Sequence, residues 1–191
     1  GDIDVLSASE NDDKIAWYEN NGAADPSFSA ATISTSADGA QSIFAIDVDS
    51  DGDIDVLSAS ENDDKIAWYE NNGSESFTAR TITTSADGAN SVYAIDVDND
   101  GDIDVLSASL LDDKIAWYKN NGSQTFSSNT ITTSTDYALW VYATDVDDDG
   151  DIDVLSASKN DDKIALNTQI VDNTPPTMTI TATDGSNAVA D

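Results

Sequence analysis

Apolar and polar residues alternate along short stretches of this chain, and turn-forming residues separate the stretches. One complete set of four such stretches begins at Ser91. Each is rich in β-branched and aromatic residues, and helical periodicity is absent. This pattern predicts short antiparallel strands joined by tight turns into one up-and-down sheet. The expected strands cover residues 91–98, 103–109, 114–120 and 125–134.

The same pattern recurs along the whole chain. The string GDIDVLSAS begins at Gly1, Gly52, Gly101 and Gly150, so the spacings are 51, 49 and 49 residues. Four-stranded units that repeat at about 40–50 residues are typical of the blades of a β-propeller. A right-handed β-solenoid is the alternative, but its coils are usually shorter. The sequence therefore predicts an all-β fold made of four-stranded antiparallel propeller blades.

The charge of the chain limits its partners. Among 191 residues, 38 are acidic and 7 are basic, which gives a net charge of −31. This charge argues against a nucleic-acid partner, because phosphates would be repelled, and it favours cations. The chain has no cysteine and no histidine, which excludes disulfides, thiolate sites and Ser-His-Asp catalysis. No apolar run is long enough to span a membrane.

Aspartates occupy alternate positions at the turn between the first two strands of the repeat. Counting from the first aspartate, the frame is D-x-D-x-D-G-x-x-D, with glycine at position 6. This spacing predicts a Ca²⁺ loop, because Ca²⁺ prefers six to eight oxygen ligands and glycine allows the sharp turn. Position 7 is expected to offer its backbone carbonyl. The candidate ligands are Asp47, Asp49, Asp51, Asp53 and Asp55; Asp96, Asp98, Asp100, Asp102 and Asp104; and Asp145, Asp147, Asp149, Asp151 and Asp153.

Two alternatives to this calcium loop can be weighed from the sequence. An EF-hand would need Glu at position 12 and flanking helices, but serine stands there, as at Ser58, and the flanks are strands. A solvated acidic turn is the usual interpretation of one charge run. Three copies in the same frame argue against it, since two like charges about 4 Å apart repel by roughly 4 kcal/mol at an effective dielectric near 20. About three complete calcium sites are therefore expected.

The string VYAIDVDNDGDIDVLSAS, followed by KIAWYKNNG, resembles the FG-GAP/VCBS repeat, the blade unit of integrin-like propellers. The resemblance covers residues 1 to about 170. It implies that the calcium loop joins the first two strands of each blade and that the ion is mainly structural. It also implies a secreted or cell-surface protein, and a bacterial one is expected.

The two ends of the repeat array depart from the pattern. The first copy keeps only Asp2 and Asp4 of the frame, and the fourth replaces AWYENN by ALNTQI. We expect about three and a half blades of a longer propeller within residues 1–171. Residues 172–191 contain Pro175 and Pro176 and are expected to form a linker, followed by the start of a module that resembles a bacterial immunoglobulin-like repeat.

Residues that differ between copies are candidates for a partner-binding surface. Leu110 and Leu111 replace Glu and Asn of the preceding copy, while Tyr137 and Trp140 replace Gly and Ser. Blade topology places the four on the rim opposite the calcium loops, where an apolar patch would mark a contact site. Alternatively, they pack on each other or on a neighbouring domain.

Residues that every copy shares are expected to build the blade. The recurring tryptophans Trp17, Trp68 and Trp117 are expected to pack between blades, and the Asp-Asp pairs at the tips are expected to form turns. Two acids can hydrolyse a glycoside, but catalysis needs one constellation rather than one in each blade. We therefore expect that the chain is not an enzyme.

The sequence predicts a calcium-binding, non-enzymatic propeller segment that serves adhesion or presents a ligand-binding face to a protein or a carbohydrate. Two rival functions remain. One is an accessory propeller of a secreted polysaccharide-degrading enzyme, and the other is a lectin-like, sugar-binding propeller.

Overall fold

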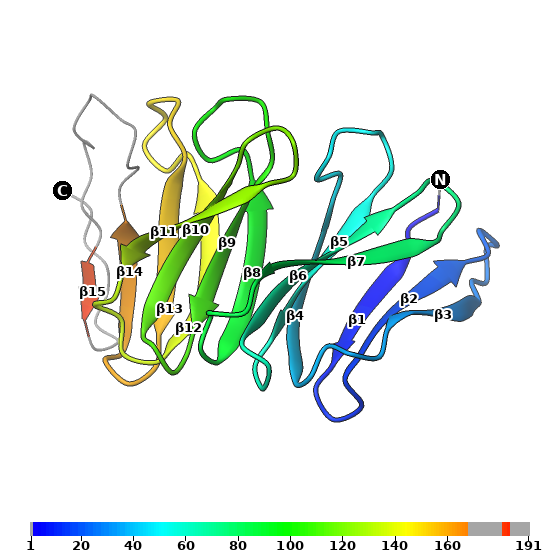
Figure 1. Ribbon diagram of the computed structural model, residues 1–191, viewed down its shortest axis with the longest axis horizontal. Coiled ribbons are helices and arrows are strands. Elements are labelled where there is room, and N and C mark those ends of the chain that lie inside the picture. Colours follow the sequence, from blue (N-terminus) through cyan, green and yellow to red (C-terminus); the bar gives the residue numbers. More distant parts are fainter. Residues whose placement is uncertain (1, 168–180, 184–191) are drawn as a thin grey trace.

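The structure is a computed structural model, and it describes residues 2–167 and 181–183. All of its regular elements are β-strands, arranged as four antiparallel sheets that follow one another from the N-terminal end to the C-terminal end (Figure 1). Each sheet is a meander of neighbouring strands. The described residues contain no helix with the length and apolarity needed to cross a membrane. The all-β prediction and the prediction of blade-like sheets are confirmed.

The strands of the four sheets have the following bounds. The first sheet contains β1 (Val5–Ser9), β2 (Lys14–Asn20) and β3 (Phe28–Ser34). The second contains β4 (Ala40–Ile46), β5 (Asp55–Ser60), β6 (Lys65–Asn71) and β7 (Phe77–Thr83). The third contains β8 (Ala89–Ile95), β9 (Asp104–Ser109), β10 (Lys114–Asn120) and β11 (Phe126–Thr132). The fourth contains β12 (Ala138–Thr144), β13 (Asp153–Ser158), β14 (Lys163–Asn167) and β15 (Thr181–Thr183).

The third sheet shows how one repeat folds into one blade. Its strands fall within one or two residues of the predicted ones, except that β8 ends at Ile95 rather than continuing to Asp98. The chain leaves the sheet there because the aspartate frame curls into a loop, with left-handed backbone at Asn99 and Gly101. β9 begins where the loop ends, at Asp104. The aspartate frame therefore sets the boundary between the first two strands of the blade.

Successive sheets meet along their first strands. The backbone N–H of Val92 in β8 donates to Ser42 Oγ in β4, and Val141 N–H in β12 donates to Ser91 Oγ in β8, both at 3.3 Å. Equivalent aromatic rings on the same strands are in contact, with centroids 4.7 and 4.8 Å apart in the series Phe44, Tyr93 and Tyr142. The first strands of the second, third and fourth sheets thus form one continuous contact.

Apolar side chains fill the spaces between sheets. The cluster between the second and third sheets includes Leu57, Trp68, Ala94 and Val105, together with Val48 from the aspartate frame. Trp68 and its equivalent Trp117 are buried, which confirms for these two that the recurring tryptophans pack between blades, whereas Trp17 is only half-buried. Because Val48 inserts from the loop into this core, the geometry of the loop and the packing of the blades depend on each other.

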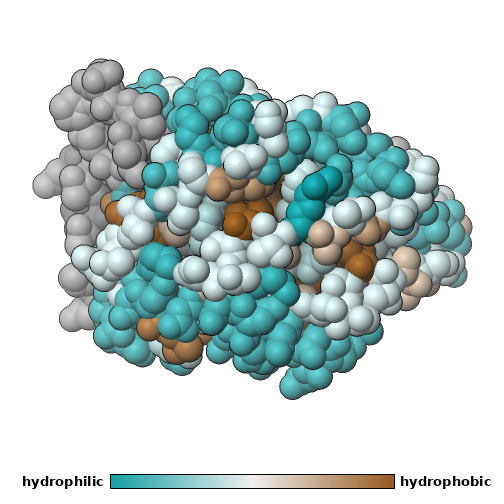
Figure 2. All heavy atoms as spheres, viewed as in Figure 1, coloured by the Kyte–Doolittle hydropathy of each residue, from teal (hydrophilic) through white to brown (hydrophobic). Residues whose placement is uncertain are grey.

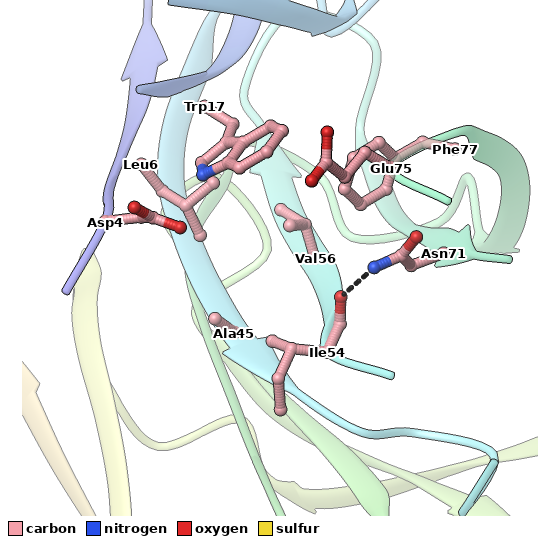
Figure 3. Close-up of a pocket in the computed structure, with 9 residues that line it drawn as sticks. All are labelled: Asp4, Leu6, Trp17, Ala45, Ile54, Val56, Asn71, Glu75 and Phe77. Carbon is pink, nitrogen blue, oxygen red and sulfur yellow. Dashed lines mark hydrogen bonds between the residues drawn. The ribbon is translucent and has the colours of Figure 1, made fainter. Parts of the chain in front are cut away.

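The space between the first and second sheets contains a pocket of about 280 Å³ (Figure 3). Leu6 and Trp17 line it from the first sheet, and Ala45 and Val56 line it from the second. In the next interface their equivalents pack around Val48, whereas the first sheet has three strands and no counterpart of Val48 in the described chain. We therefore assign this pocket to incomplete packing between sheets and not to a ligand.

The fourth sheet receives its last strand from the C-terminal region. β15 pairs antiparallel with β14, so that Thr183 lies opposite Lys163. The predicted linker and immunoglobulin-like start at 172–191 otherwise lie outside the described residues, as does the proposed domain boundary near residue 171. The linker with its immunoglobulin-like start and the domain boundary therefore stay predictions.

The Asp-Asp tips connect each sheet to the next. Asp64 has left-handed backbone, with φ 54°, and its Oδ1 accepts a hydrogen bond from Gly88 N–H at the start of the third sheet. Asp113 repeats both features, with Tyr137 as the donor at 2.8 Å. Asp64 and Asp113 therefore stabilise the turn at the hairpin tip and bind the backbone of the segment that leads into the next sheet, as expected for residues that build the blade.

The contact between first strands predicts that Ser91→Ala destabilises the protein by about 1–3 kcal/mol. Val141 is buried, and its N–H would lose its acceptor without gaining water in exchange. The measurement is the free energy of unfolding in urea. Ser109→Ala is the matched control, since Ser109 is buried in the same sheet and its hydroxyl has no partner among the described residues. Equal losses for both variants would contradict the assigned role of Ser91.

Candidate metal centre

Each complete aspartate frame folds into the same loop. In the first loop, Asp47 Oδ1 accepts a hydrogen bond from Asp51 N–H at 3.2 Å, and Oδ2 accepts one from Gly52 N–H at 2.9 Å. The loops that begin at Asp96 and Asp145 repeat both contacts. Gly52 has φ +99°, a conformation that L side chains rarely adopt. The hydrogen bonds of the position-1 aspartate and the backbone conformation of the glycine therefore curl the loop through protein contacts alone.

The position-9 aspartate is the buried anchor of each loop. Asp55 is about 1% exposed. Its Oδ2 accepts a hydrogen bond from Val48 N–H in the loop at 3.0 Å, and its Oδ1 accepts one from Asn71 N–H at the end of β6 at 2.7 Å. Asp104 makes the corresponding pair of contacts, with distances of 3.2 and 2.7 Å. One carboxylate thus joins the loop to two strands.

The structure brings the acids of positions 1, 3 and 9 together. Within each group one carboxylate oxygen per residue lies within 4.8 Å of the others. Asp49 Oδ1 and Asp98 Oδ1, both at position 3, are buried and have no hydrogen-bond partner among the described residues. Three converging carboxylates with unsatisfied oxygens fit a hard cation that prefers oxygen ligands. The groups are Asp47, Asp49 and Asp55; Asp96, Asp98 and Asp104; and Asp145, Asp147 and Asp153.

The electrostatics of the groups reflect this crowding. Burial raises the pKa of Asp104 to about 6, although the hydrogen bonds from Asn120 and Val97 act in the opposite direction. Burial also raises the pKa of Asp55 and Asp153. The pKa of Asp49 is raised by burial first and by the negative charge of Asp51 second. A divalent cation in the group would favour the charged forms of these carboxylates.

Positions 5 and 7 are placed differently from the other three. Asp51 Oδ1 accepts a hydrogen bond from Asp53 N–H at 2.9 Å, so this carboxylate is engaged within the loop. The Asp53 carboxylate lies against Gly73, 2.3 Å from where a Cβ would stand. Asp102 stands in the same way against Gly122. Position 7 therefore directs its side chain to the neighbouring turn, an arrangement compatible with the expected use of its backbone carbonyl.

The incomplete first copy keeps part of this arrangement. Asp4 Oδ1 accepts a hydrogen bond from Asn20 N–H at 2.8 Å, as Asp55 does from Asn71. Asp2 lies against Gly22, as Asp53 does against Gly73. These residues do not belong to any of the three acidic groups in the described chain. The first copy therefore retains the strand contact of the frame without the cluster.

Sequence reasoning missed two residues that approach these groups from the third strand of each sheet. Glu70 in β6 lies near Asp49, whose pKa its negative charge helps to raise. Lys119 occupies the same place in β10, and its ammonium contacts Asp98 Oδ2 and, at 3.1 Å, Asp100 Oδ2. Aligning the copies would have revealed the exchange of Glu for Lys, but only the fold shows that this position faces the loop.

The four residues of the predicted patch differ in exposure. The hairpin tip between β9 and β10 is joined to the segment that leads into β12, because Thr135 Oγ1 donates a hydrogen bond to the Asp113 carbonyl. Leu111 and Trp140 are 62% and 58% exposed, whereas Tyr137 is half-buried beneath the Lys159 ammonium. Leu110 is 4% exposed, so its prediction as a contact residue needs correction. Its N–H donates to the Gly88 carbonyl, and it packs under the tip.

Comparison with solved structures gives a fold relative. A lectin from Agrocybe aegerita, described as specifically recognising non-reducing terminal N-acetylglucosamine, superposes with a TM-score of 0.53 at 18% sequence identity. The match covers 86% of this chain and 50% of the lectin, so the chain spans about half of the lectin's length. At this identity the likeness concerns the fold alone. A search of curated proteins found no match.

Comparison with protein families accounts for the repeats. A model of the FG-GAP-like repeat matches three overlapping segments, residues 1–58, 47–107 and 96–156. Each of the last two begins at the first aspartate of a loop, and together the three segments cover most of the chain. The chain therefore belongs to the FG-GAP-like repeat family.

Proposed function

We propose that this chain is a calcium-binding, non-enzymatic propeller segment of a secreted or cell-surface protein. The observation that carries the proposal is the threefold convergence of acids at positions 1, 3 and 9, with a buried and unpartnered oxygen on Asp49 and on Asp98. FG-GAP repeats are typical of extracellular proteins, where calcium is abundant. The proposed ligands are all the frame aspartates identified from the sequence, with position 7 acting through its carbonyl.

The ion would have a structural role in this arrangement. It would neutralise carboxylates that burial and mutual repulsion otherwise disfavour. Because Asp55 also binds the backbone of Val48 and Asn71, an ion on its carboxylate would fix the loop, β5 and β6 together. The acidic groups recur in three blades, whereas catalysis normally needs one constellation. This supports a binding role over catalysis, with adhesion or ligand presentation as the activity.

Lectin-like carbohydrate binding is a second candidate function. The observation that favours it is the exposed indole of Trp140, since a flat apolar ring with a polar N–H suits contact with a sugar. The lectin of similar fold supports the choice of N-acetylglucosamine as the first probe. Titration of this sugar should shift tryptophan fluorescence, and Trp140→Ser should abolish the binding. An accessory role beside a polysaccharide-degrading domain is compatible with the same result.

Calcium should raise the melting temperature of the chain, and a chelator should lower it. A ligand at 100 times its dissociation constant adds about 2.7 kcal/mol per independent site. Calorimetry should give about three sites, with Mg²⁺ binding more weakly because it demands a smaller octahedron. Asp49→Asn should remove one site, whereas Asp25→Asn makes the same charge change in an exposed loop and should remove none. An identical melting curve in calcium and in chelator would contradict the proposal.

The exposed pair Leu111 and Trp140 should contribute to partner binding and little to stability. The double variant Leu111→Asn with Trp140→Ser restores the residues of the preceding copy, and its melting temperature should stay within a few degrees of the wild type. Leu110→Glu is the contrasting variant, and it should lower the melting temperature strongly because Leu110 is buried. A large loss of stability in the double variant would assign these residues to packing instead.

A further inference from the structure

The first two acidic groups are not equivalent, because the third strands of the second and third sheets present different residues to the loop. The position holds Glu70 in the second sheet and Lys119 in the third, each preceded by a tyrosine that pairs with the second residue of the neighbouring strand. In the fourth sheet Asn167, the last residue of β14, takes the place of that tyrosine. The second sheet thus carries an acid at this position and the third a base.

Lys119 contacts the second acidic group. Its ammonium contacts the Asp98 carboxylate, and a second contact to Asp100 Oδ2 measures 3.1 Å. The Asp98 side chain is 6% exposed, and its other oxygen, Oδ1, is buried with no partner in the described chain. The lysine therefore pairs with two acids of the frame, one of which belongs to the converging group.

The packing around Lys119 favours this position of its ammonium. The Nζ atom also lies over the ring of Trp117, 6.0 Å from the centroid, where a cation is attracted to the aromatic face. A lysine ammonium is ordinarily charged at neutral pH, since its usual pKa is about 10.4. The lysine therefore supplies a permanent positive charge to the second loop from within the chain.

The first loop has the opposite arrangement. Glu70 adds negative charge near Asp49, and its carboxylate is held by the guanidinium of Arg80. Arg80 is in turn placed over the ring of Trp68, 5.3 Å from its centroid. The third sheet has Asn129 opposite Trp117, where Arg80 stands opposite Trp68. The first loop therefore has a fixed extra carboxylate where the second has an ammonium.

We infer that Lys119 is a built-in counter-ion that sets the calcium affinity of the second loop below that of the first. The inference rests on the proposed calcium function and deepens it. A calcium ion that enters the second group must displace the ammonium from Asp98 and then share the loop with a positive charge. Ligand charge count tunes the affinity of such loops. The second loop should consequently fill after the first, and its blade should keep its fold better without calcium.

The test isolates the second loop and exchanges the charge. Asp49→Asn and Asp147→Asn silence the first and third loops, and calorimetry then measures calcium binding with and without Lys119→Glu. This substitution restores the residue of the preceding copy, and we expect it to tighten binding at least about tenfold, which corresponds to 1.4 kcal/mol. Lys159→Glu makes the same charge change at the opposite rim and should leave the affinity within about twofold, because salt screens distant charges.

Melting in chelator gives a readout that does not depend on calcium. Lys119→Glu should lower the melting temperature there, because it removes the internal counter-ion from Asp98 and leaves five aspartates and a glutamate together. In saturating calcium the same variant should melt at or above the wild-type temperature. This reversal of sign separates a counter-ion from an ordinary surface ion pair, whose loss would act in the same direction in both solutions.

The outcomes distinguish the two claims. If the first and third loops bind calcium and Lys119→Glu leaves the second loop unchanged, the role of Lys119 is overturned and the calcium function stands. If the wild-type chain binds no calcium at any loop, both claims are overturned. The reciprocal variant Glu70→Lys should weaken the first loop at least about tenfold, and an unchanged affinity there would also count against the inference.

Discussion

The buried carboxylate at position 9 connects the parts of each blade. In the second and third sheets it accepts N–H groups from the loop and from the third strand, while its own residue begins the second strand. Buried charge is costly unless it is hydrogen-bonded and neutralised. The two hydrogen bonds meet part of this requirement, and a cation would meet the rest. Strand boundaries, loop curl and insertion of Val48 or Val97 into the core all depend on this one group.

The same dependence would couple metal affinity to blade stability in this fold. The acids of positions 1 and 3 lie on the loop, but position 9 of the second and third sheets lies in a strand whose other residues are buried. A change in the charge of the acidic group should therefore change the stability of the sheet. Lys119, which contacts the group from β10, changes the local charge without altering the fold. The second and third sheets keep the same strand register although their loops differ in charge.

Much of this architecture could be predicted from the sequence, because repetition acts as an alignment of the chain with itself. The period and the strands follow from local patterns. The aspartate frames were also found from the sequence, but the convergence of positions 1, 3 and 9 in particular is seen only in the fold. Leu110 was misjudged because exposure depends on how the tip meets Gly88 in the preceding link, a contact between distant residues. Lys119 was missed for a related reason. Its side chain reaches a loop 21 residues earlier in the sequence, and only the pairing of β9 with β10 brings them together.

The exchange of serine for tryptophan at Trp140 has a consequence for how such a gene can change. Ser42 and Ser91 each accept an N–H from the following first strand, and Trp140 stands at their equivalent position in the fourth sheet. Copies this similar invite unequal crossing-over, which shuffles, deletes or duplicates whole units. A chain in which the fourth unit moved to an internal position would lose an acceptor for a buried N–H and would have to fit an indole where a hydroxymethyl group belongs. The units therefore resemble one another closely in sequence but are not interchangeable in order.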